Sequence, residues 1–114
     1  DYISDHYREN IKIEQLSANC HLSESHFRRI FSGCMHMSPV EYINLIRVRT
    51  ACEKLKKTDR SATDIGTECG FASDSAFNRN FRKLMGMSPA EWRKKGENYE
   101  QLLLKFDIRT EEGW

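Results

Sequence analysis

The sequence predicts an all-α fold in which two helix-turn-helix units, about seven helices in all, are joined by one long helix. The chain carries one pattern twice, because residues 16–42 are echoed by residues 65–92. The offset is 49 residues up to Leu22 and 50 residues from Phe27 onward. A repeat of this length indicates a duplicated structural unit. Apolar residues keep helical spacing in both copies, and no segment alternates as a strand would.

The first unit is expected to open with two short helices. Apolar residues at i, i+4 and i+8 (Ile3, Tyr7 and Ile11) predict an amphipathic helix at the start of the chain. A second helix is expected over residues 13–20, with Cys20 on its buried face as a small core residue.

The third helix is predicted from its cap and its aromatic residues. Ser23 is a suitable N-cap, since its hydroxyl can accept from a backbone N–H of the first turn. Phe27, Ile30 and Phe31 are expected to face the core, and Gly33 lies near the expected end of the helix.

A capping box predicts the start of the long helix. Ser38, Pro39 and Glu41 stand at the N-cap, N1 and N3 positions of that arrangement. The helix is expected to reach about Lys57. Its apolar residues that face the two units are Ile46, Val48, Cys52 and Leu55.

The second unit repeats these elements. Ser61 is expected to cap a helix that runs to Cys69, and Ser73 or Asp74 to cap the next helix. Residues 88–91 repeat the capping box and begin a last short helix through Trp92. The side chains that face inward on the middle helix are Phe77, Phe81 and Leu84.

These elements divide the chain into three parts. Residues 1–57 hold the first unit with the linking helix, and residues 58–96 hold the second unit. Residues 97–114 form a C-terminal tail, for which a short helix and an irregular acidic end are expected.

Two pairs of equivalent residues bear on the turns. Gly70 suits the left-handed backbone of a tight helix-turn-helix bend, and His21 holds the matching place in the first unit. If His21 adopts the same backbone, the strain costs roughly 1 kcal/mol. Ser17 and Gly66 also match, and both are small, as a close crossing of two helices requires.

Charge and composition narrow the function. The net charge is only +1, yet residues 23–95 carry 14 Lys and Arg against 8 Asp and Glu. Basic charge on the repeated part favours a phosphate-facing surface. No apolar run approaches the roughly 18 residues of a membrane helix, and no signal peptide opens the chain. A cytoplasmic protein is therefore expected, and Asp1 at the start suggests a piece of a longer protein or a processed terminus.

The four cysteines (Cys20, Cys34, Cys52 and Cys69) form no CxxC pair and no usual zinc spacing. We expect no metal, no disulfide framework and no cofactor.

The helices near residues 24–32 and 74–83 each have an aromatic back and a polar, Arg-bearing front on a helical wheel. In a helix-turn-helix, the second helix lies in the major groove with its N-terminal half against base edges. Arg29 and Arg79 are the best-placed base readers, since Arg can bond guanine O6 and N7 together. The other predicted base contacts are Ser25, Arg28, Ser75 and Asn78.

Contacts to DNA phosphates are expected from basic side chains and from helix N-termini, whose backbone N–H groups can donate to phosphate. The residues assigned to this role are Ser32, Ser38, Ser61, Arg82, Lys83 and Arg93.

Alternatives remain at this point. The polar fronts of the two helices can be ordinary solvated faces. Alternatively, the chain can be a protein-interaction module whose basic faces dock an acidic partner such as RNA polymerase. An enzyme is not expected, because the chain has no Gly-rich phosphate loop, nucleophile elbow or evident carboxylate pair. A cysteine-based methyl acceptor is conceivable, although no cysteine stands in a recognisable reactive setting.

Over residues 3–95 the chain resembles the C-terminal DNA-binding domain of the AraC/XylS family of bacterial transcription regulators. The stretches that carry the resemblance are Leu22-Ser-Glu-Ser-His-Phe27-Arg-Arg-Ile-Phe31, Met37-Ser-Pro-Val-Glu-Tyr42 with Arg47, Ile65-Gly-Thr-Glu-Cys-Gly70-Phe71, and Met87-Ser-Pro-Ala-Glu-Trp92-Arg93. The resemblance implies seven helices and two recognition helices that enter adjacent major grooves on one face of double-stranded DNA.

The chain departs from the family at three positions. Gly66 stands where the family usually has Ala, and His21 stands where Gly is frequent. The predicted base-reading position 25 holds only the short side chain of Ser. The family usually joins this domain to an N-terminal sensing or dimerising domain, which is expected to be missing from this piece.

Overall fold

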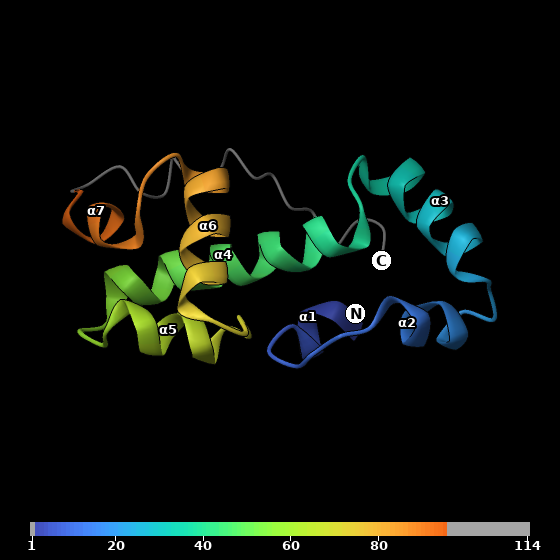
Figure 1. The fold of residues 1–114 in the computed structure, drawn as a ribbon, viewed down its shortest axis with the longest axis horizontal. Coiled ribbons are helices and arrows are strands. Elements are labelled where there is room, and N and C mark those ends of the chain that lie inside the picture. The colour runs from blue at the N-terminus through green and yellow to red at the C-terminus, as the bar shows by residue number, and fades with distance from the viewer. Residues whose placement is uncertain (1, 96–114) are drawn as a thin grey trace.

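The computed structural model describes residues 2–95 of the chain, and the regular secondary structure of this part is helical, with no strand. The expectations for residues 97–114 lie outside the described residues. The helices are α1 (Tyr2–His6), α2 (Ile13–Asn19), α3 (Glu24–Met35), α4 (Pro39–Lys57), α5 (Ala62–Glu68), α6 (Asp74–Met85) and α7 (Pro89–Lys94). Helix α4 runs along the middle, with α1–α3 around its N-terminal end and α5–α7 around its C-terminal half (Figure 1). The predicted all-α fold of two units on one long helix is confirmed.

Both predicted capping boxes form. The Ser38 hydroxyl accepts from the Glu41 backbone N–H, and the Glu41 carboxylate accepts from the Ser38 N–H, each at 3.1 Å. Ser88 and Glu91 repeat this arrangement at the same distances. The hydrogen bonds from Ser38 lower the pKa of the Glu41 carboxyl, and those from Ser88 do the same for Glu91. Local sequence therefore determines where α4 and α7 begin.

Each unit has its own hydrophobic core, and α4 belongs to both. The first core contains Ile3, Ile13, Leu16, Phe27, Phe31, Tyr42, Ile43 and Ile46. The second contains Val48, Ala51, Cys52, Leu55, Ile65, Cys69, Phe71, Phe77, Phe81 and Trp92. Phenylalanines at i and i+4 pack together in each, with ring centroids 5.8 Å apart in the first unit and 5.7 Å apart in the second. The predicted inward face of α4 is confirmed, and so are the inward positions of Phe77 and Phe81 on α6.

Equivalent positions in the turns of the two units share the same left-handed backbone conformation. His21 has a φ of 59° where its counterpart Gly70 has 105°, so His21 adopts the predicted left-handed backbone. The C-caps of α3 and α6 form a second such pair, with a φ of 59° at His36 and 75° at Gly86. The first unit thus places histidine twice where the second unit uses glycine, and each histidine carries the strain of a left-handed L-residue.

Three expectations for the first unit are wrong. Helix α1 ends at His6 because the chain turns there, with the Glu9 N–H bonded to the His6 carbonyl at 2.9 Å, so Ile11 lies beyond the helix. Cys20 is exposed, because it is the C-cap of α2 and lies past its last full turn. Ile30 is 46 % exposed, since it lies at the edge of the face of α3 on which Phe27 is buried.

Helix α3 is also longer than expected. It passes Gly33 and ends at Met35, because the left-handed His36 provides the stop. In the second unit, Leu84 is only partly buried at the edge of the core.

Candidate nucleic-acid interface

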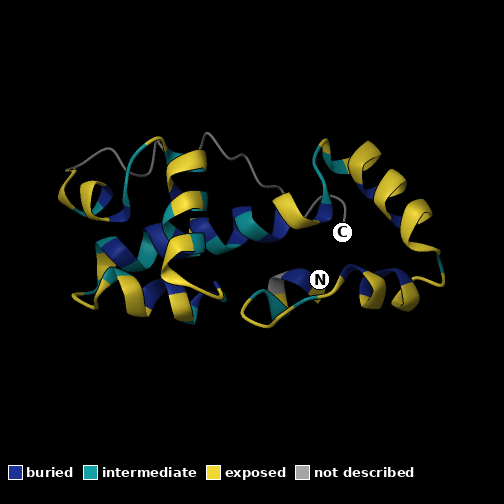
Figure 2. Ribbon diagram, viewed as in Figure 1, coloured by how far each residue is buried: buried dark blue, intermediate teal, exposed yellow. Residues whose placement is uncertain are grey.

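Helices α3 and α6 are held in the same way. Each has 12 residues and a serine N-cap, with the Ser23 hydroxyl accepting from His26 N–H at 3.2 Å and that of Ser73 accepting from Ala76 N–H at 3.0 Å. Each helix buries two phenylalanines and leaves most of the opposite side exposed (Figure 2). We call the exposed sides face 1 (Ser25, Arg28, Arg29 and Ser32) and face 2 (Ser75, Asn78, Arg79 and Arg82).

Every predicted base-reading residue lies on these two faces. All four residues of face 1 are exposed, and Ser75, Arg79 and Arg82 of face 2 are exposed as well. Asn78 is half-buried, and its side-chain amide donates to the Asp74 carbonyl at 2.9 Å. An adenine contact by the Asn78 amide nitrogen therefore requires this hydrogen bond to break, whereas its Oδ1 needs no such change.

The residues assigned to phosphates have different settings. Ser32, Ser61, Arg82 and Lys83 are exposed. Ser38 is half-buried, and its backbone N–H is already bonded to Glu41.

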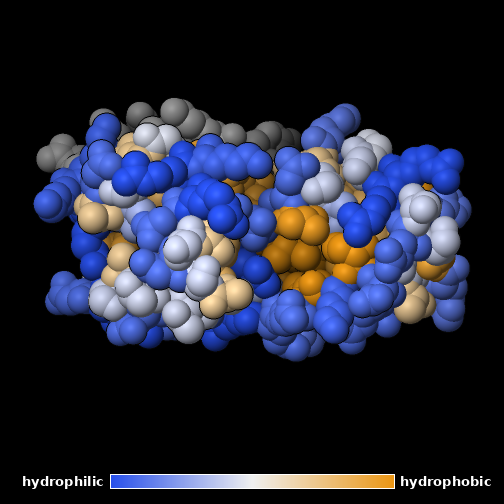
Figure 3. Space-filling model, viewed as in Figure 1, coloured by the Kyte–Doolittle hydropathy of each residue, from blue (hydrophilic) through white to orange (hydrophobic). Residues whose placement is uncertain are grey.

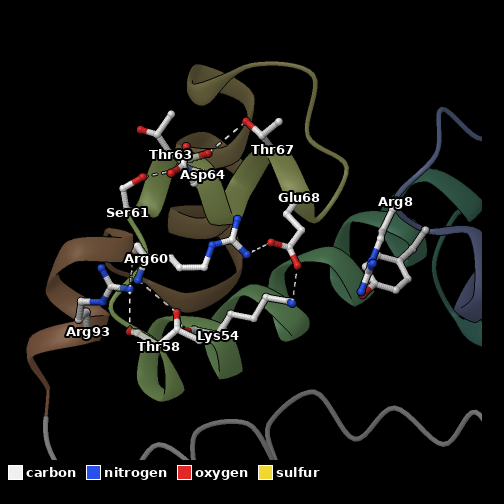
Figure 4. A network of polar contacts seen from close by, with 11 residues as sticks. Arg8, Lys54, Thr58, Arg60, Ser61, Thr63, Asp64, Thr67, Glu68 and Arg93 are labelled. Atoms are coloured by element: carbon white, nitrogen blue, oxygen red, sulfur yellow. Dashed lines mark hydrogen bonds and ion pairs between the residues drawn. The ribbon is translucent and has the colours of Figure 1, made fainter.

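The guanidinium of Arg93 is already hydrogen-bonded within the protein. This guanidinium donates to the Leu55 carbonyl at 2.9 Å. It also donates to the Thr58 carbonyl at 3.2 Å and to the Arg60 carbonyl (Figure 4). These carbonyls lie at and just beyond the C-terminal end of α4, where helix carbonyls lack intrahelical partners. Arg93 therefore stabilises the junction of α4 and α7, and we leave it out of the phosphate-binding set.

A polar network orients α5 on α4. The Glu68 carboxylate pairs with Lys54 at 2.7 Å and with Arg60 (Figure 4). Ser61 caps α5 as predicted, accepting from the Asp64 N–H at 3.1 Å. These partly exposed ion pairs contribute little stability individually. They join α5 to α4, and α5 in turn packs against α6.

The molecule is long enough to place the two faces in successive grooves. Its principal extents are 44 × 27 × 21 Å, and α3 lies beyond the N-terminal end of α4 whereas α6 crosses the C-terminal half of α4 (Figure 1). Successive major grooves on one side of B-DNA are about 34 Å apart. The described part therefore presents two exposed polar helices on a body whose longest extent exceeds this groove spacing.

Comparisons with known proteins identify the family. A family model described as a helix-turn-helix domain matches residues 16–95. The DNA-binding domain of AdpA, a global transcriptional factor solved in complex with a target DNA, is 30% identical, with a TM-score of 0.77 over 81% of this chain and 83% of that one. A regulator from Chromobacterium violaceum, described as having an AraC-type DNA-binding domain, is 24% identical and shares the fold with a TM-score of 0.73, over 81% of this chain and 82% of that one. The chain belongs to the AraC-type helix-turn-helix family.

Curated relatives are longer than this AraC-type domain. The melibiose operon regulatory protein of Escherichia coli is 30% identical over 100 residues, which cover 88% of the chain and 33% of that protein. The MmsAB operon regulatory protein of Pseudomonas aeruginosa is 29% identical over 94 residues, which cover 82% of the chain and 31% of that protein. The chain therefore spans about a third of the length of these relatives.

The AraC-type domain has surface features that the sequence did not predict. A small cleft of about 50 Å³ lies between α4 and α6, and it is lined by Glu41, Asn44, Asn80, Lys83 and Leu84. A larger apolar hollow of about 130 Å³ opens over the first unit (Figure 3). It is lined by Tyr2, Ile3, Leu16, Asn19, Cys20, Phe27 and Phe31. Both depend on how separate helices meet in space, which the periodicity within one helix does not reveal.

The described residues show neither a metal-binding cluster nor a membrane-spanning helix. Residues 2–95 contain no group of three His, Cys, Asp or Glu side chains that is placed to hold a metal ion. None of the helices from α1 to α7 combines the length and apolar character that crossing a membrane requires.

Proposed function

We propose that face 1 and face 2 of this AraC-type domain read base edges in two adjacent major grooves of double-stranded DNA. As a member of its family, the chain is a DNA-binding domain of a bacterial transcription regulator. The observation that carries the finer proposal is the pair of matching, Arg-bearing helix faces on one long helix.

Arg29 and Arg79 are assigned to guanines, because an exposed guanidinium on a recognition helix can donate to O6 and N7 together. The remaining base contacts are assigned to Ser25, Arg28, Ser75 and Asn78. Phosphate contacts are assigned to Ser32, Ser38, Ser61, Arg82 and Lys83, which would position the helices without reading sequence.

For the whole regulator, we propose that a sensing or dimerising domain accompanies this one, since the relatives are about three times its length. RNA polymerase is the proposed protein partner, and the cytoplasm is the proposed location. The DNA-binding proposal does not depend on these three points.

The test is selection of binding sites from a random duplex library at moderate salt. We expect two conserved blocks about 10 base pairs apart, one for each recognition helix. Arg29→Ala and Arg79→Ala should each weaken binding to the selected site by about 1–3 kcal/mol and relax sequence preference in a different block.

Lys57→Ala is the matched control, because Lys57 is exposed at the end of α4 and lies on neither face. A variant of Arg29 or Arg79 that binds the selected site as tightly as the unchanged protein would remove that helix from the base-reading interface. Absence of any enriched sequence would favour a protein-interaction module instead.

A further inference from the structure

The loop between α1 and α2 contacts the second unit directly. In Figure 1 this loop reaches the turn between α5 and α6. Gly70 lies in that turn, and a Cβ built on it would be 2.6 Å from the Tyr7 carbonyl oxygen and 3.0 Å from the Arg8 Cα. Only glycine allows this approach of two backbones, and its φ of 105° is also one that other residues rarely adopt.

Arg47 of α4 occupies the centre of this contact. Its Nε donates to the Tyr7 carbonyl at 2.7 Å, and one terminal nitrogen donates to the Glu9 carbonyl at 2.8 Å. Its guanidinium carbon also lies 5.8 Å from the ring centroid of Phe71, which belongs to the second core. One side chain therefore contacts the loop of the first unit and the turn of the second.

A guanidinium suits this place better than an ammonium would. It presents several donors in a fixed plane, and the same plane can stack on an aromatic ring. Arg47 is half-buried, and burial lowers the pKa of its guanidinium. Arginine nevertheless stays protonated in proteins. The planar guanidinium of Arg47 thus joins the α1–α2 loop, helix α4 and the α5–α6 turn.

Helix α4 sets the distance between the units, but a single helix can bend and its two ends can turn relative to each other. A lateral contact beside the helix resists both motions. We propose that Arg47 is a positioning residue that holds α3 and α6 in one relative orientation and thereby sets the spacing between the two half-sites of the DNA. The spacing part rests on the proposed function, whereas the orientation part concerns the free protein.

The first experiment needs no DNA. Spin labels are placed on the exposed native Cys34 of α3 and on α6 through Lys83→Cys, in a Cys20→Ser background, and the distribution of distances between them is measured. Arg47→Lys should broaden this distribution, because lysine keeps the charge but loses the fork. Arg49→Lys, on an exposed position of the same helix, is the matched control and should leave the width unchanged.

The second experiment measures how Arg47→Lys and Arg49→Lys, each made in the otherwise unchanged protein, bind DNA. The duplexes carry the selected half-sites at the native spacing and at spacings changed by one and two base pairs. Each added base pair turns one half-site by about a tenth of a turn relative to the other. For the native spacing, Arg47→Lys should lose about fivefold or more in affinity, in the lower range of typical coupling between two sites. Its preference for that spacing should shrink relative to the unchanged protein and to Arg49→Lys.

The outcomes separate the two proposals. An unchanged distance distribution in Arg47→Lys, with folding verified by circular dichroism, overturns the positioning role whatever happens with DNA. A broadened distribution with an unchanged spacing preference overturns the part that concerns DNA. If the unchanged protein selects no bipartite site, the proposed function fails, while the distance measurement still decides whether Arg47 holds the two units together.

Discussion

Gly66 of α5 packs against the ring of Phe77 of α6 so closely that a Cβ built on the glycine would lie 2.5 Å from a ring carbon. The nearest atoms are at the root of the phenylalanine and not at its far end, so the ring cannot simply turn away. Both residues are buried, and Phe77 packs between Phe71 and Phe81. The crossing of α5 and α6 therefore depends on the missing side chain of Gly66.

Gly66→Ala should lower the free energy of unfolding by about 1–3 kcal/mol, because an overpacked core must shift. Gly33→Ala is the matched control. Gly33 also lies within a helix, but a Cβ there would meet nothing within 4 Å. This change should raise the free energy of unfolding by up to about 1 kcal/mol, the gain in helix propensity. Urea unfolding measures both, and a stabilised Gly66→Ala protein would contradict the close crossing.

His36→Gly should raise the free energy of unfolding by about 0.5–1 kcal/mol, because the left-handed backbone at the end of α3 strains an L-residue but not glycine. His26→Gly makes the same chemical change at an exposed position within α3 and should lower the free energy of unfolding by about 0.3–0.5 kcal/mol, the difference in helix propensity between His and Gly. Thermal unfolding of the two variants should therefore move in opposite directions. Movement in the same direction would show that His36 is not strained.

Arg93→Ala should destabilise the domain by about 1–3 kcal/mol, since partly buried carbonyls beyond α4 would lose their donor. It should leave unchanged the slope of log affinity for DNA against log salt. Lys83→Ala should do the reverse, with stability retained and a slope reduced by about 1. Chemical unfolding and a salt titration of DNA binding separate the two roles. A reduced slope in Arg93→Ala would restore Arg93 as a phosphate contact.

The cysteines should differ in reactivity according to burial. Burial raises the pKa of the Cys52 thiol to about 12 and also raises that of Cys69. A thiol reagent at about pH 8 should therefore modify only the exposed Cys20 and Cys34 of the folded protein. Mass spectrometry of peptides after alkylation checks this, and rapid labelling of Cys52 would indicate that the second core opens readily.

The raised pKa of Cys52 also predicts how stability varies in alkali. Its folded pKa of about 12 exceeds the unfolded value of 9.0, so deprotonation favours the unfolded chain. The contribution is fully present below pH 9.0 and is lost as the pH rises from there toward 12. Cys52→Ala, which cannot titrate, should show a weaker decline in the free energy of unfolding over this interval.

The sequence by itself determined the helices, their order and the two outward faces. These features follow from interactions within about four residues: serine caps, capping boxes and apolar residues at helical spacing. The repeat then showed that both units share one plan, including the left-handed backbone at His21. The exposed positions of Arg29 and Arg79 were predictable for the same reason, because a helix that buries two phenylalanines must expose its opposite side.

Only the tertiary structure decided what several side chains do. The sequence assigned Arg93 to a DNA phosphate and gave Arg47 no role, whereas in the structure each bonds backbone carbonyls more than 30 residues away. The exposure of Cys20 and Ile30 likewise depends on where neighbouring helices end and meet. No local pattern encodes these contacts, because they arise when distant segments pack together and satisfy each other's unpaired backbone groups.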